Sequence, residues 1–185
     1  MAHRVCPWWL GYWLLSPLRK LRENPRKALG PHVREGMVVL EPGCGMGFFT
    51  LELARMVGPT GRVVAVDLQP RMLAGLARRA SRAGLVGRIE SRRAEPASLG
   101  IADLAGKVDV AVALHVVHEL PDVAGFFGEV HTSLKPGGSL LIAEPRGHVS
   151  EADFGVSLEA AQRAGFRASG SLPGLWGRTA LLIKA

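Results

Sequence analysis

The chain has 185 residues, of which 48% are hydrophobic and 21% are charged, and it carries a net charge of +7. This length and composition predict one folded domain with a substantial core, and they exclude an intrinsically disordered chain. The basic excess favours weak attraction to anions, and arginine-rich solvated faces explain it more simply than a dedicated nucleic-acid surface.

The N-terminal stretch CPWWLGYWLLSPLRK, residues 6–20, holds three of the four tryptophans and the only tyrosine. Its apolar run from Val5 to Leu15 is shorter than the roughly 20 residues that a membrane span needs. Pro7, Gly11 and the basic residues that follow the run disfavour a signal peptide. We therefore expect a cytoplasmic protein without a transmembrane segment.

The two cysteines, Cys6 and Cys44, lack the spacing of a zinc site, and nothing in the sequence suggests a disulfide framework. We predict no metal site. The scarcity of cysteine also fits a reducing compartment.

From residue 37 onward, short apolar runs alternate with helical patterns. Strands are expected at 37–41, 62–67, 88–94, 108–115 and 139–144. Helical patterns cover 48–57, 70–84 and 121–134, and KPGG is expected to form a turn before the fifth strand. Apolar runs that alternate with helices predict a parallel sheet covered on both faces.

The C-terminal part has a different order, because a predicted helix at 150–165 is followed by strands at 166–170 and 178–185. No helix separates these two strands, so they are most simply an antiparallel hairpin. The expected fold class is therefore α/β, with a mostly parallel, doubly wound seven-stranded sheet and helices on both faces.

A glycine-rich loop, LEPGCGMGF, places Gly43, Gly45 and Gly47 between the first strand and the following helix. Glycines let the backbone turn tightly, and the helix N-terminus offers free amide donors to a ligand. The spacing is E-x-G-x-G-x-G and differs from the dinucleotide pattern G-x-G-x-x-G. Glu41 would repel a pyrophosphate but would suit a cationic amino group.

Asp67 ends the second strand, where a carboxylate can accept hydrogen bonds from a ribose diol. Together with Glu41 and the glycine loop, it predicts a site for a nucleoside with a positively charged tail. S-adenosylmethionine is such a ligand.

These motifs resemble those of class I S-adenosylmethionine-dependent methyltransferases. The matching stretches lie in about residues 37–145 and are VLEPGCGMGFFT, VVAVDLQPRML, RRAEPASL, VDVAVALHVVHELPD and LKPGGSLLIAEP. The resemblance implies an enzyme with a Rossmann-like fold, S-adenosylmethionine as cofactor and S-adenosylhomocysteine as product. It also implies that the last strand inserts antiparallel between its neighbours.

The resemblance further implies roles for residues on the methionine and ribose side of the cofactor. Glu41 and the Gly43–Gly47 loop would face the methionine portion, and His115 would line the same side. Asp67 would hold the ribose hydroxyls.

On the adenine side, Leu68 would pack on the ring, and Ala94 and Glu95 would lie near its edge. Arg93 stands where many family members carry an acid. Either Glu95 substitutes for that acid, or adenine is held by backbone groups and packing.

Methyl transfer needs a base only when the acceptor must lose a proton, because the sulfonium is already a good leaving group. His118 and His148 follow the fourth and fifth strands, at the edge where such sheets bind ligands. Both are candidate catalytic residues. The structural alternatives are a helix-orienting role for His118 and an ordinary loop position for His148.

The chain lacks an N-P-P-[YF] segment and a large C-terminal insertion. In both respects it resembles the compact small-molecule methyltransferases. We predict methyl transfer to a small, partly apolar metabolite by a monomer or homodimer. One alternative is a tRNA or rRNA methyltransferase that binds through a patch formed by Arg78, Arg79, Arg82, Arg88, Arg92 and Arg93. Another is a non-catalytic cofactor-binding module.

We expect residues 1–30 to form an aromatic helical segment and residues 31–185 the S-adenosylmethionine-binding domain. In the family, substrate selectivity often resides in such a segment. The candidate substrate contacts are Trp8, Trp9, Tyr12 and Trp13. The alternatives for this segment are a helix docked on the domain with its aromatics in the core, and a weak membrane-surface contact.

Overall fold

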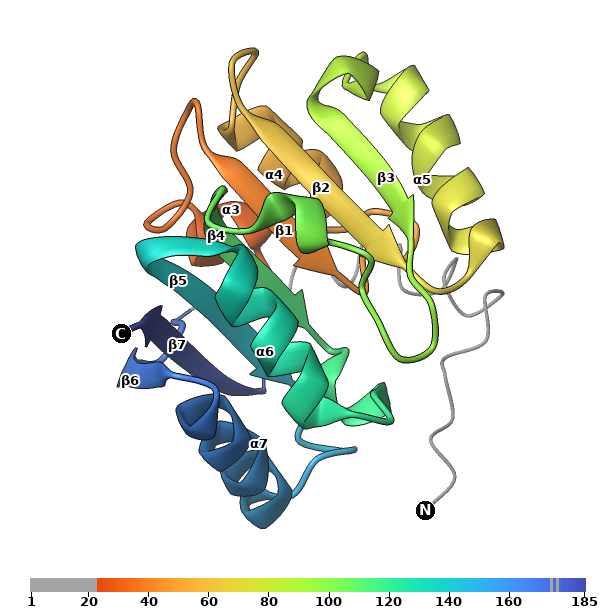
Figure 1. Ribbon diagram of the computed structural model, residues 1–185. Helices are drawn as coiled ribbons and strands as arrows, with labels where there is room; N and C mark the ends of the chain where they lie inside the picture. Colours follow the sequence, from red (N-terminus) through yellow and green to blue (C-terminus); the bar gives the residue numbers. More distant parts are fainter. Residues whose placement is uncertain (1–22, 174, 176) are drawn as a thin grey trace.

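The computed structural model describes residues 23–173, 175 and 177–185, which form one sheet flanked by helices (Figure 1). The sheet has seven strands in the order β3-β2-β1-β4-β5-β7-β6. The strands are β1 Val38–Pro42, β2 Arg62–Asp67, β3 Ile89–Arg93, β4 Val108–Leu114, β5 Leu134–Glu144, β6 Phe166–Gly170 and β7 Arg178–Lys184. The helices are α3 Pro25–Leu29, α4 Thr50–Met56, α5 Pro70–Arg82, α6 Val123–Ser133 and α7 Glu151–Arg163, with short 3-10 turns η1 Val86–Arg88, η2 Ala102–Leu104 and η3 Val117–Glu119.

The predicted doubly wound α/β fold is confirmed. Strands β1 to β5 pair in parallel, whereas β7 pairs antiparallel with both β5 and β6. The last strand therefore inserts between its neighbours, as expected. It runs antiparallel because only a loop, and no crossover helix, joins β6 to β7.

Two hydrophobic cores lie on opposite faces of the sheet, because successive strand residues point to opposite sides. Leu40 and Ile142 belong to the core under α6 and α7, whereas Val39 and Leu141 belong to the core under α3, α4 and α5. Figure 1 shows α6 and α7 in front of the sheet and α3 and α4 behind it. The apolar runs of the central strands are thus explained by burial on both faces.

The KPGG segment was predicted to form a turn before the fifth strand, but it lies within that strand. Strand β5 begins at Leu134 and includes residues 135–138, and its register against β4 shifts between Val108 and Val110. Gly137 has a φ of 72°, a conformation that glycine adopts readily. The segment is therefore an irregularity within the strand, which lets pairing resume at Ser139.

Helix α3 lies within the predicted N-terminal segment, and its Ala28 and Leu29 are buried in the core that also holds Leu53. The domain boundary after residue 30 stays a prediction. Within the described residues, none of the helices combines the length and apolar character that crossing a bilayer requires.

Candidate active site

The glycine loop follows β1 and is held against the end of β2. The amides of Gly43 and Cys44 donate to the Val66 carbonyl at 2.8 and 3.1 Å. Gly43, Gly45 and Gly47 all have positive φ, with values of 72°, 54° and 82°. This backbone conformation disfavours residues with a side chain, which explains why glycine recurs at every second position.

Replacing Gly43 by alanine is expected to destabilise the fold by about 2 kcal/mol, from the positive φ and from overpacking. A Cβ at this position would lie 2.6 Å from Cγ2 of Val116. Gly128→Ala in α6 is the matched control, because a Cβ there meets nothing within 4 Å. Urea unfolding of both variants measures the difference, and equal stability for the two would contradict the interpretation.

Asp67 supports the loop directly. Its Oδ2 accepts from the Gly45 amide and its Oδ1 accepts from the Gln69 amide, both at 2.8 Å. Burial raises the pKa of Asp67, and these two amides oppose that rise. Each carboxylate oxygen keeps a lone pair beyond its amide contact, so the residue can still accept from a ligand.

Glu41 is a buried acid at the end of β1, and only 4% of its surface is exposed. Its Oε2 has no hydrogen-bond partner among the described residues. Burial raises the pKa of Glu41 to about 8; the Thr50 hydroxyl opposes the rise and the Asp67 charge adds a smaller part to it. A buried carboxyl with an unused oxygen is suited to receive a cationic partner.

The residues expected around adenine lie near Asp67. The Ala94 amide donates to the Asp67 carbonyl at 3.1 Å, and Ala94 is buried while Leu68 is half-buried. Glu95 is exposed and exchanges backbone hydrogen bonds with Ser98. The structure thus brings Leu68 and Ala94 to the end of β2, whereas the Glu95 side chain is open to solvent.

His118 is held by an acid that the sequence analysis did not identify. Its Nδ1 is hydrogen-bonded to Oε2 of Glu144, the last residue of β5, and this bond raises the pKa of His118. Glu144 is 1% exposed, and its Oε1 accepts from the amides of Val116 and Val117 at 3.2 and 2.9 Å. The fixed Nδ1 contact leaves Nε2 as the nitrogen that can take a proton.

His148 lies beside His118, with ring centroids 5.9 Å apart, but its side chain is exposed. The structure therefore brings the two predicted catalytic histidines together. Glu144 could have been found in the sequence, because it is an acid at the carboxyl end of a buried strand, as Glu41 is.

His115 directly follows β4 and contacts a second acid that the sequence analysis missed. Its Nε2 lies 2.8 Å from Oε1 of Glu23, a buried residue just before α3. Trp8, Trp9, Tyr12 and Trp13 lie outside the described residues. Within the part of the chain that the structure describes, no group of three His, Cys, Asp or Glu side chains could hold a metal ion.

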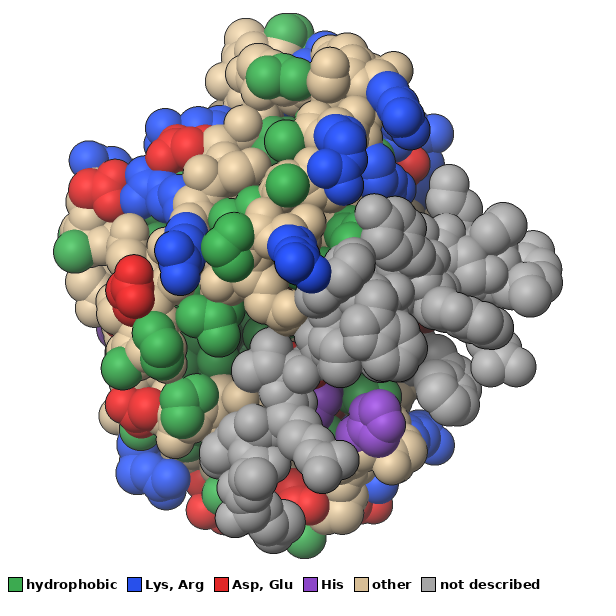
Figure 2. All heavy atoms as spheres, turned by 90° about the vertical axis from the view of Figure 1, so that its right-hand side faces the viewer, with side chains coloured by type: hydrophobic (Ala, Val, Ile, Leu, Met, Phe, Trp, Pro, Cys, Tyr) green, Lys and Arg blue, Asp and Glu red, His purple; other side chains and the backbone are tan. Residues whose placement is uncertain are grey.

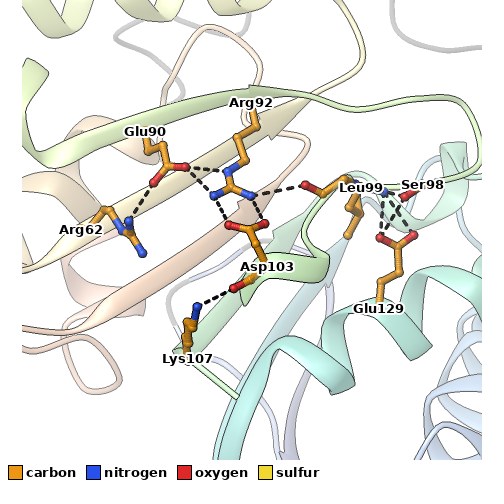
Figure 3. A network of polar contacts seen from close by, with 9 residues as sticks. Arg62, Glu90, Arg92, Ser98, Leu99, Asp103, Lys107 and Glu129 are labelled. Carbon is orange, nitrogen blue, oxygen red and sulfur yellow. Dashed lines mark hydrogen bonds and ion pairs between the residues drawn. The ribbon is translucent and has the colours of Figure 1, made fainter. Parts of the chain in front are cut away.

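Several arginines of the expected basic patch bind groups of the protein itself. Arg92 contacts Glu90 and both oxygens of Asp103, and Glu90 also pairs with Arg62 (Figure 3). Arg79 donates to the Met46 carbonyl, and Arg88 to that of Ala54. Figure 2 shows basic side chains gathered on the upper part of one face and others scattered below, where histidine is also exposed. The internal contacts of these arginines weaken the case for a nucleic-acid surface.

Comparison with known proteins adds independent information. A family model described as a methyltransferase domain matches residues 33–170. The ubiquinone/menaquinone biosynthesis C-methyltransferase UbiE of an Enterobacter species is 33% identical over 112 residues, which are 60% of this chain and 44% of that protein. The ubiquinone biosynthesis O-methyltransferase of Methylocella silvestris is 32% identical over 130 residues, covering 70% of this chain and 48% of that one.

The chain thus matches less than half the length of these curated relatives. A solved structure of similar size is a SAM-dependent methyltransferase from Aquifex aeolicus. It has a TM-score of 0.86 and 26% identity, and the match covers 98% of this chain and 100% of that one.

Proposed function

The chain belongs to the class I S-adenosylmethionine-dependent methyltransferases, and from this membership we propose that it methylates a small, partly apolar metabolite. S-adenosylmethionine is the cofactor of the family. It supplies a methyl group bound to a sulfonium, and the sulfur is a good leaving group when the methyl group is transferred. The observation that carries the proposal is the arrangement of Glu41, the glycine loop and Asp67 at the ends of β1 and β2.

The residues present fit this cofactor. Glu41 has an unpaired buried oxygen for an ammonium group, and Asp67 has lone pairs for ribose hydroxyls. Leu68 and Ala94 offer apolar surface beside Asp67 for the adenine ring. The glycine loop lets the ligand approach the backbone closely.

Cofactor binding at pH 7 is expected to release close to one proton from Glu41. With a pKa of about 8, the free carboxyl is protonated roughly ten to one at this pH. An adjacent ammonium favours the carboxylate, so the proton leaves on binding. Calorimetry with S-adenosylhomocysteine, in buffers of different ionisation enthalpy, measures this release.

Glu41→Gln is the matched variant, because it keeps the shape of the side chain and removes the titrating group. It should bind more weakly and release no proton. A heat of binding that is independent of the buffer for the natural protein would contradict the assignment of Glu41.

We propose His118 as the general base, positioned by Glu144. A carboxylate on Nδ1 orients the imidazole and stabilises the cation that forms when Nε2 accepts a proton. A base of this kind serves an acceptor that carries an ionisable hydrogen. The relatives are methyltransferases of ubiquinone and menaquinone biosynthesis, which supports a phenol or quinol ring as acceptor.

The test is incubation of the full chain with methyl-labelled S-adenosylmethionine and a panel of phenols, catechols, naphthoquinols and unmodified tRNA. Label in an organic-extractable ring compound is the expected result. Label in the RNA fraction would replace the proposed acceptor class by the nucleic-acid alternative. Absence of S-adenosylhomocysteine binding at millimolar concentration would contradict the proposed function as a whole.

A further inference from the structure

A carboxylate–imidazole pair, formed by a buried carboxyl and a half-buried ring, lies at the carboxyl end of β4, in addition to the His118–Glu144 pair. Glu23 Oε1 and His115 Nε2 are 2.8 Å apart, and they are separated by 92 residues in the chain. Glu23 precedes Asn24, whose side chain accepts from the Lys27 amide and caps α3. The pair therefore joins the chain that enters α3 to the end of a central strand.

The backbone of His115 adopts a left-handed conformation, which indicates that the surrounding structure fixes the direction of its side chain. Its φ is 61°, and among the described residues every other positive φ belongs to a glycine. Such a conformation is unfavourable for a residue with a side chain, and it persists only where the surroundings enforce it. Here the His115 amide donates to the Ala143 carbonyl at 2.7 Å, and the ring contacts Glu23.

The second ring nitrogen, Nδ1, is buried and has no hydrogen-bond partner among the described residues. Because Nε2 faces a carboxylate, the hydrogen of a neutral ring belongs on Nε2, and Nδ1 then carries a lone pair.

His115 also lies beside the glycine loop. The next residue, Val116, packs so closely on Gly43 that a Cβ there would be 2.6 Å from Cγ2 of Val116. The unpaired Nδ1 is thus an acceptor at the same edge of the sheet as Glu41. An acceptor in this place suits an N–H donor of the ligand.

We propose that Glu23 is a positioning residue that fixes the Nε2–H tautomer of His115, so that Nδ1 accepts a hydrogen bond from the ammonium group of S-adenosylmethionine. The inference rests on the proposed function, and it adds a residue outside the recognisable motifs. Glu23 acts through His115 and selects for the amino-acid end of the cofactor.

The test is ¹⁵N NMR of the histidine rings in the full chain, with S-adenosylhomocysteine and with 5′-methylthioadenosine, which lacks the amino-acid end. Comparison with His115→Ala assigns the signals. We expect His115 to be protonated on Nε2 alone and its Nδ1 signal to move with S-adenosylhomocysteine but not with 5′-methylthioadenosine. Glu23→Gln should mix the two tautomers of His115. It should weaken the binding of S-adenosylhomocysteine about tenfold, which corresponds to the loss of one good hydrogen bond. The binding of 5′-methylthioadenosine should stay unchanged.

Glu159→Gln on α7 is the control, since Glu159 is an exposed acid whose contact is with Arg163. It should leave both affinities and the tautomer as they are. If Glu23→Gln unfolds, His115→Ala tests the contact from the histidine side, with the same selective loss expected.

Three results would overturn the inference: a protonated Nδ1 in the free protein, an Nδ1 signal unmoved by bound S-adenosylhomocysteine, or equal losses for the two ligands in Glu23→Gln. Each leaves the proposed methyltransferase function standing. Failure of S-adenosylhomocysteine to bind the natural chain would contradict that function and, with it, this role of Glu23.

Discussion

Replacing Asp67 by alanine is expected to weaken the binding of S-adenosylhomocysteine by about 100-fold, because hydrogen bonds to a charged group are lost on both sides of the residue. The variant loses the proposed acceptors for the ribose hydroxyls. It also loses the contacts with the amides of Gly45 and Gln69, which hold the glycine loop against the start of α5. Titration calorimetry measures the loss, and thermal unfolding separates it from a change in stability.

Asp103→Ala is the control for this experiment. Asp103 is an exposed acid paired with Arg92 in a surface network whose labelled residues include none of the glycine loop (Figure 3). It should bind S-adenosylhomocysteine as the natural chain does. Unchanged affinity in Asp67→Ala would mean that the carboxylate does not bind the cofactor. Its role would then be only to support the loop through its two contacts with backbone amides.

Replacing His118 by alanine is expected to lower turnover by about 1,000-fold, the middle of the range for loss of a general base. Affinity for S-adenosylhomocysteine should change little, because the proposed role of His118 is toward the acceptor. The measurement is methyl transfer to the acceptor that the labelling panel identifies, together with calorimetry. His148→Ala should have a much smaller effect, since His148 is exposed.

The pH dependence of kcat/KM gives a second readout of His118. In the proposed role the neutral imidazole is the active form, and the bond to Glu144 raises the pKa of His118 above its ordinary value of 6.5. Activity should therefore rise with pH along a limb centred above 6.5. Glu144→Gln should move that limb to lower pH and slow turnover; a limb that stays in place would assign the titration to another group.

The sequence determined the alternation of strands and helices, because strands buried on both faces need apolar runs such as RVVAVD. It also predicted the antiparallel hairpin, since no helix stands between β6 and β7. The glycine spacing and the acids Glu41 and Asp67 predicted where the cofactor would bind, and this stays a prediction. Each of these features is local, so a short stretch of chain carries its signal.

Only the tertiary structure decided which acids meet which histidines. Glu144 reaches His118 because β5 lies beside β4, and Glu23 reaches His115 across 92 residues of chain. The sequence placed both histidines at a sheet edge but carried no sign of these partners. Pairing of distant side chains depends on strand order, register and rotamer, which arise from the packing of the whole domain and from no local pattern.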